Sequence, residues 1–85
     1  MTYTDADADR YGRALARAIE AETKLAHATG EQAIAIALDC TLDTRAELAR
    51  LSGMTAETLR AIERGKRPTR AQRAALCWAI VKRWT

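Results

Sequence analysis

The sequence predicts an all-α protein of about five helices, folded as a single domain over residues 1–85. An 85-residue chain has room for one small core. Alanine contributes 19 residues, and because it forms helices readily but adds little bulk, only 22 larger apolar side chains remain. A threonine followed three residues later by glutamate or glutamine, the spacing of a helix capping box, recurs along the chain. These observations favour closely packed helices around a modest core.

An acidic N-terminal helical segment is expected over residues 5–41. Its first helix lies within residues 4–30, where a cluster of aspartates suits a helix N-terminus. Tyr11, Leu15 and Ile19 then recur at helical spacing. Gly30 offers a stop for this helix.

Residues 30–41 allow two interpretations. Ile34, Ile36 and Leu38 alternate with alanines, as in a short strand. However, the alanines favour a helix, Thr29 and Gln32 offer a capping pair, and the sequence holds no second strand to pair with. We therefore expect a buried helix.

Three further helices follow, each marked by a threonine cap at its start. The first and second are expected to stop at glycines, and the third runs to the end of the chain. Glutamate or glutamine stands at capping-box spacing in the first and third of them. The expected boundaries, in order, are Thr44 (with Glu47) to Gly53, Thr55 to Gly65, and Thr69 (with Gln72) to Trp84.

Charge divides the chain at Asp43. Residues 1–43 carry four Lys/Arg against eight Asp/Glu, a net charge of −4, whereas residues 44–85 carry ten against three, a net charge of +7. A solvated surface is one explanation of the basic half. The other is that the basic half faces a polyanion such as nucleic acid.

Several classes of protein are not supported by the sequence. No run of about 18 apolar residues indicates a membrane span, and the aspartate-rich N-terminus is unlike a signal peptide, so we expect a cytoplasmic protein without membrane contact. Cys40, Cys77 and His27 lack metal-ligand spacing, and we expect no metal and no cofactor. Both cysteines are expected to be reduced, although a disulfide is not excluded.

Residues 44–65 carry the informative motif, two short capped helices joined by a tight turn. Ala49 is small where the second helix crosses the first, and Gly53 tolerates the positive φ that the turn needs. An apolar stripe is expected to face inward from both helices, formed by Leu48, Leu51, Met54, Leu59 and Ile62.

This pattern resembles the phage repressor and Cro family of helix-turn-helix proteins, also called XRE-like, in which a stretch such as ELAxxxGxSxxTIxxIExG is typical. The matching residues here are Glu47-Leu48-Ala49, Gly53-Met54-Thr55, Thr58-Leu59 and Ile62-Glu63-Arg64-Gly65. The resemblance covers residues 44–80. It implies a lambda-repressor-like helix-turn-helix domain with an extra N-terminal helix.

The resemblance also implies that the helix after Thr55 is a recognition helix in the DNA major groove. With Leu59 and Ile62 inward, helical periodicity turns four side chains outward, and these are expected to contact bases together with Ala56 at the helix N-terminus: Glu57, Arg60, Ala61 and Arg64. Arg60 suits guanine, Glu57 suits cytosine, and an alanine suits a thymine methyl group. A weak surface pair between Glu57 and Arg60 is the alternative.

Further residues around this helix are expected to contact phosphates, because they are cations or lie at helix N-termini where free N–H groups favour an anion. They are Thr44, Arg45, Thr55, Lys66, Arg67, Arg70 and Arg73. Each cation alone is also explained as a solvated side chain. Glu63, beside the inward stripe, is expected to pair with a basic neighbour.

The last helix is apolar on two faces and therefore needs two partners. One face is expected to join the core. Trp78 and Val81 on the other are expected either to form the interface of a two-fold homodimer or to be covered by the N-terminal helices of the same chain.

The function expected is that of a sequence-specific DNA-binding transcriptional regulator, a small phage or bacterial Cro-like or autoregulatory repressor that binds double-stranded DNA as a homodimer on an inverted repeat. The alternative is a protein-interaction module, such as an antitoxin or adaptor, whose acidic N-terminal segment binds a basic protein partner. An enzyme is not expected, because the sequence shows no Gly-rich phosphate loop, carboxylate pair or nucleophile-base arrangement.

Overall fold

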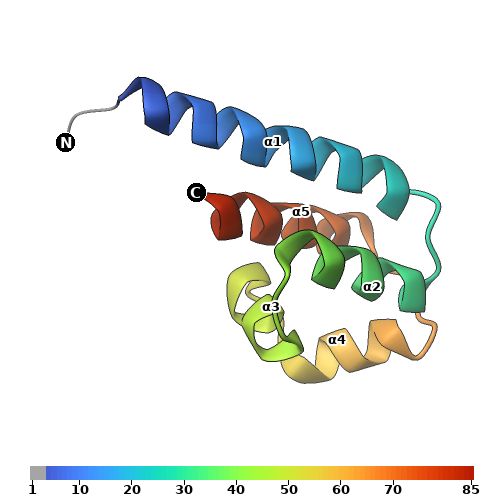
Figure 1. Cartoon of the computed structure of the whole chain (residues 1–85). Helices are drawn as coiled ribbons and strands as arrows, with labels where there is room; N and C mark the ends of the chain where they lie inside the picture. Colours follow the sequence, from blue (N-terminus) through green and yellow to red (C-terminus); the bar gives the residue numbers. More distant parts are fainter. Residues whose placement is uncertain (1–3) are drawn as a thin grey trace.

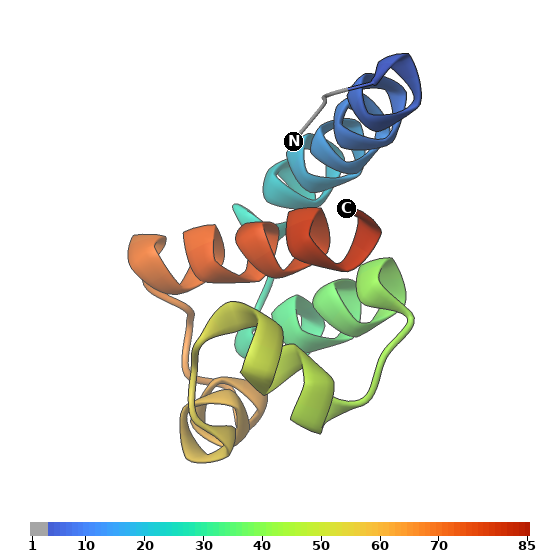
Figure 2. The same cartoon turned by 90° about the vertical axis from the view of Figure 1, so that its left-hand side faces the viewer.

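The computed structural model describes residues 4–85, and within this range the fold is all-α with five helices. They are α1 (Asp5–Leu25), α2 (Gly30–Thr41), α3 (Arg45–Ser52), α4 (Ala56–Glu63) and α5 (Arg70–Trp84). Helix α1 lies along one side of the molecule, α4 lies at the opposite side, and α2, α3 and α5 pack between them (Figures 1 and 2). The expectation of an all-α fold of about five helices is confirmed.

Local sequence signals set most of the helix starts. Threonine side chains cap all five helices by accepting a hydrogen bond from the backbone N–H three residues on: Thr4, Thr29, Thr44, Thr55 and Thr69. The expected capping boxes at Thr29 with Gln32 and at Thr69 with Gln72 are confirmed. The reciprocal bond expected from Glu47 is not formed, because the Glu47 carboxylate pairs instead with the Arg50 guanidinium at 2.6 Å.

Gly30 does not end the first helix, and that expectation is wrong. Helix α1 stops at Leu25, while Gly30 is the first residue of α2. A Cβ atom at position 30 would lie 2.0 Å from the carbonyl oxygen of Ile62 and 2.6 Å from that of Lys66. Gly30 therefore lets the start of α2 lie directly against the end of α4.

The helical interpretation of residues 30–41 is confirmed. Ala33, Ile34 and Ala37 are buried, while Ile36 and Leu38 are half-buried on other sides of the same helix. Because α2 packs against each of the other four helices, apolar side chains around most of its circumference find neighbours. This placement explains why the apolar pattern also fits a strand.

The core consists of two adjoining clusters. The larger joins α2, α3, α4 and α5 with the end of α1 at Leu25, and Ile34, Leu48, Leu59, Ile62 and Leu76 in it are at most 1% exposed. The smaller joins α1 to α5 through Ala18, Ala21, Ile80 and Val81. Helix α1 thus packs mainly against α5, with alanines on the α1 side of the cluster.

Polar contacts fix the C-terminal turns of α5. Trp84 Nε1 donates to the Cys40 carbonyl oxygen at the end of α2 (2.8 Å), and Lys82 Nζ donates to the Leu51 carbonyl oxygen in α3 (3.2 Å). The Arg17 guanidinium of α1 lies 4.3 Å from the centre of the Trp84 ring. These contacts hold α5 in place behind α3.

Candidate nucleic-acid interface

Helices α3 and α4 form a two-helix unit joined by a short turn. Leu48 and Leu51 of α3 and Leu59 and Ile62 of α4 are all buried in the larger core cluster. Met54, in the turn, packs against the same cluster. The inward stripe expected from the sequence is therefore present, and it fixes which face of α4 points outward.

The turn between them adopts the geometry that its glycine allows. Gly53 has φ +73°, in the left-handed region where other residues are strained. The Ser52 hydroxyl donates to the Ala49 carbonyl oxygen and accepts from the Met54 N–H, both at 3.3 Å. The Thr55 hydroxyl then accepts from the Thr58 N–H at 3.1 Å and begins α4.

The outward face of α4 carries the residues expected to contact bases. Ala56, Glu57, Arg60 and Arg64 are exposed, and Ala61 is half-buried. Arg60 Nε lies 3.5 Å from the Ala56 carbonyl oxygen, so its side chain lies back along the helix. Within residues 4–85 no ion pair is formed by Glu57 or by either arginine, and the alternative surface pair of Glu57 with Arg60 is absent there.

The loop after α4 and the start of α5 add further cations. Lys66, Arg67 and Arg70 are exposed. Arg73 is half-buried, and its guanidinium donates to the Pro68 carbonyl oxygen at 3.1 Å. This contact holds the loop against α5.

Thr44 and Arg45, both expected near phosphates, have partners within the protein. The Thr44 hydroxyl caps α3, and the Arg45 guanidinium donates to both carboxylate oxygens of Glu63, with Nε 3.0 Å from each. These hydrogen bonds lower the pKa of Glu63 and raise that of Arg45. The pair ties the start of α3 to the end of α4, so the expectation of a basic partner for Glu63 is confirmed.

Several exposed cations on and after α4 are not neutralised by ion pairs. In the basic half of the chain, Arg45, Arg50 and Arg83 are engaged in ion pairs. The remaining exposed cations around α4, none of them in an ion pair within residues 4–85, are Arg60, Arg64, Lys66, Arg67 and Arg70, which we call the α4 basic surface. Ion pairing thus leaves free charge beside α4.

The two residues expected at a dimer interface differ in their exposure to solvent. Val81 is 6% exposed and belongs to the cluster that joins α5 to α1. It is a core residue of the single chain, because α1 covers this part of α5. Trp78 is 57% exposed.

Sequence reasoning missed two features that support the site. Gly30 allows α2 to brace the end of α4, and Lys82 reaches the last turn of α3. A glycine directly after a capping threonine signals the first feature, because it stands where helix propensity alone favours another residue. No local signal reveals the second.

Within residues 4–85, no group of His, Cys, Asp and Glu side chains is arranged to hold a metal ion, and no helix has the length and apolar character needed to cross a membrane. Comparisons with protein-family models, curated proteins and solved structures found no significant match.

Proposed function

We propose that this protein is a sequence-specific DNA-binding transcriptional regulator, a small Cro-like repressor of the helix-turn-helix type. One observation carries the proposal. The second helix of a glycine-turned two-helix unit presents an exposed polar face, and exposed cations without ion pairs within residues 4–85 lie on and beside it. Helix-turn-helix proteins insert a short helix into the major groove and use the cations around it to contact phosphates.

The dimensions of α4 fit this role. Eight residues make a helix about 12 Å long, and the major groove is about 12 Å wide. In the proposed complex Arg60 donates two hydrogen bonds to guanine, Glu57 accepts from cytosine, and Ala56 or Ala61 contacts a thymine methyl group. Arg64 extends the same face.

The surrounding residues position the helix without specifying sequence. Lys66, Arg67 and Arg70 contact phosphates on one side of α4, and the N-termini of α3 and α4 offer backbone N–H groups on the other. The pair of Arg45 with Glu63 keeps α3 and α4 at a fixed angle. In this proposal Arg45 acts mainly through Glu63, and phosphate contact is secondary.

A single α4 contacts few base pairs, so the proposal includes a homodimer on an inverted repeat in the cytoplasm. Two-fold symmetry of the protein then matches that of the site, with half-sites about 34 Å apart or a multiple of that distance.

Two alanine variants test the proposal by fluorescence anisotropy on a duplex selected from a random pool. Arg60→Ala is expected to cost about 1–3 kcal/mol on that duplex and little on scrambled DNA, because it removes a contact to one base. Lys66→Ala is expected to weaken both duplexes alike and to lower the salt dependence by about one unit of slope. Lys24→Ala removes the same charge from α1, on the far side of the molecule, and should change neither affinity.

Equal losses on selected and scrambled DNA for Arg60→Ala would contradict the base contact. A wild-type chain that binds no duplex at low salt would contradict the function as a whole. That second result would favour the interaction module, for which the exposed Asp5 and Asp9 and the half-buried Asp7 at the start of α1 offer an acidic surface.

A further inference from the structure

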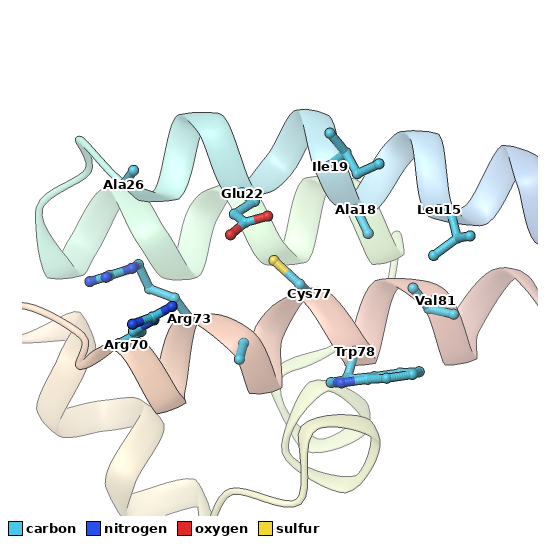
Figure 3. A pocket seen from close by; sticks show the side chains of 11 residues that line it. Leu15, Ala18, Ile19, Glu22, Ala26, Arg70, Arg73, Cys77, Trp78 and Val81 are labelled. Carbon is cyan, nitrogen blue, oxygen red and sulfur yellow. The ribbon is translucent and has the colours of Figure 1, made fainter.

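A groove of about 450 Å³ runs between α1 and α5 (Figure 3). Leu15, Ile19 and Ala26 line its α1 side, and Cys77 and Trp78 line its α5 side. Arg70 and Arg73 lie at the end near Ala26, with Glu22 as the one acid among the lining residues. Ile19 is 62% exposed and Trp78 is 57% exposed, so the groove has an apolar rim open to solvent and a basic end.

The N-terminal part of α1 extends beyond the rest of the fold. The two helices are antiparallel, and α1 continues past the C-terminus of α5 (Figure 1). Residues 4–13, which we call the α1 overhang, include no buried residue, and burial begins at Ala14. The helical residues of the overhang, 5–13, span about 14 Å, and the groove from Leu15 to Ala26 spans about 17 Å along α1. The overhang and the groove are therefore of similar length.

One apolar face continues from the groove onto the overhang. Tyr11, Leu15 and Ile19 are four residues apart and lie on the same side of α1. Tyr11 is 41% exposed. The overhang cannot fill the groove of its own chain, because both belong to one straight helix. A second copy supplies a second overhang.

We infer that two copies of this chain pair through α1 in antiparallel orientation, each overhang lying in the α1–α5 groove of the other. The two-fold axis passes near Leu15, so that Tyr11 of one copy meets Ile19 and Trp78 of its partner. Such a contact is isologous and closes after two copies.

Charge favours this orientation. Asp7 lies four residues before Tyr11 on the same side of α1, and antiparallel pairing brings it toward the basic end of the partner's groove, at Arg73. Asp9 and Arg13, two residues before and after Tyr11, both fall on the opposite side of α1 from it. A parallel pairing would bring the aspartates of the two copies together instead.

This pairing is compatible with the proposed function and specifies the interface of the proposed homodimer. Helices α1 and α4 lie on opposite sides of the molecule (Figures 1 and 2). A two-fold axis that runs from the α1 side to the α4 side leaves both copies of α4 on the same side of the dimer. The inference rests on the proposed function only for this last point, since the pairing itself needs no DNA.

Sedimentation equilibrium of the full chain without DNA tests the pairing. We expect a reversible monomer–dimer equilibrium for the wild type and a dissociation constant at least about tenfold higher for Ile19→Glu, because a charge would enter an apolar contact. Tyr11→Glu should have the same effect from the overhang, where no buried neighbour is disturbed. The matched control is Leu42→Glu, which changes an equally exposed residue (67%) away from the groove and should leave the dissociation constant unchanged.

Circular dichroism checks that each variant keeps its helices. A wild type that stays monomeric at every concentration would overturn the inference and leave the overhang to a different protein. A dimer weakened no more by Ile19→Glu and Tyr11→Glu than by Leu42→Glu would overturn it as well. Since no DNA is present, failure of the DNA-binding proposal leaves these results unaffected.

Disulfide trapping tests the orientation, with Cys40 and Cys77 replaced by serine. A mixture of Tyr11→Cys and Ile19→Cys chains should form a mixed disulfide under mild oxidation, and neither chain alone should cross-link efficiently. Efficient cross-linking of each variant with itself would indicate parallel pairing and contradict the inference.

Discussion

Replacement of Gly30 by alanine tests whether α2 braces α4 as the structure indicates. The added Cβ atom would lie 2.0 Å and 2.6 Å from the carbonyl oxygens of Ile62 and Lys66. Both oxygens belong to the backbone, one in the last turn of α4 and one in the loop that follows it, so the clash is relieved only if α2, α4 or that loop shifts.

The magnitude follows from two opposing effects. Overpacking against a rigid neighbour costs about 3 kcal/mol, the upper part of the usual range. Alanine regains at most about 1 kcal/mol over glycine, the value for a helix interior, since Gly30 is the first residue of α2. Gly30→Ala should therefore lower the free energy of unfolding by about 2 kcal/mol, which corresponds to a fall in Tm of roughly 8–16 °C for a domain of this size.

Thermal unfolding followed by circular dichroism measures the effect, and Gly12→Ala is the matched control. A Cβ atom at position 12 meets nothing within 4 Å, so the same substitution in α1 should raise the free energy of unfolding by roughly 0.5–1 kcal/mol. The change in the unfolded chain is the same for both variants, and their difference isolates the contact with α4. Equal stability of the two variants would refute the close contact between α2 and α4.

Three further predictions follow from particular residues. Leu42 caps the end of α2 with φ +56°, a left-handed conformation that strains a leucine, and its side chain is 67% exposed. Leu42→Gly should therefore raise the free energy of unfolding by about 1 kcal/mol and raise Tm with it. An unchanged or lower Tm would argue against that strain. Hydrogen bonds from Arg45 lower the pKa of Glu63 in the folded state, so the pair stabilises the fold above about pH 4.3 and this stability is lost as the pH falls through the lowered value. Over that range Glu63→Gln should lose less stability than the wild type, and identical losses in the two proteins would contradict the pair. Burial raises the pKa of the Cys40 and Cys77 thiols, so iodoacetamide should alkylate them more slowly in the folded protein than after denaturation at the same pH, and equal rates would count against their burial.

The sequence predicted the parts of the fold that depend on local interactions. The starts of α2, α4 and α5 follow from threonine caps, whose hydrogen bonds join residues three apart. The sequence predicts a helix over residues 30–41 in spite of their strand-like alternation, because it offers no second strand to pair with. The buried stripe of α3 and α4 follows from helical periodicity in the same way.

The remaining features depend on contacts between distant residues. Gly30 has the sequence character of a helix stop, but its position is explained by the backbone of α4, more than thirty residues away. Glu47 has capping-box spacing, yet the nearby Arg50 guanidinium attracts its carboxylate more strongly than a backbone N–H does. The apolar pattern of α5 predicted two covered faces without showing that α1 buries Val81 and leaves Trp78 exposed.

The candidate site likewise combines features that follow from local periodicity with features that depend on contacts between helices. The outward direction of Arg60 and Glu57 follows from the inward stripe on the same helix. The engagement of Arg45 by Glu63 does not, because these residues lie on two helices whose crossing angle no local pattern specifies. Positive charge in the sequence therefore overstated the number of cations free to contact DNA.

Methylation protection of guanine N7 on a selected duplex tests the central claim most directly, because N7 is exposed only in the major groove. Insertion of α4 predicts protected guanines in both half-sites and loss of that protection with Arg60→Ala while backbone protection persists. Backbone protection without any protected guanine, in the wild type, would contradict the insertion of α4.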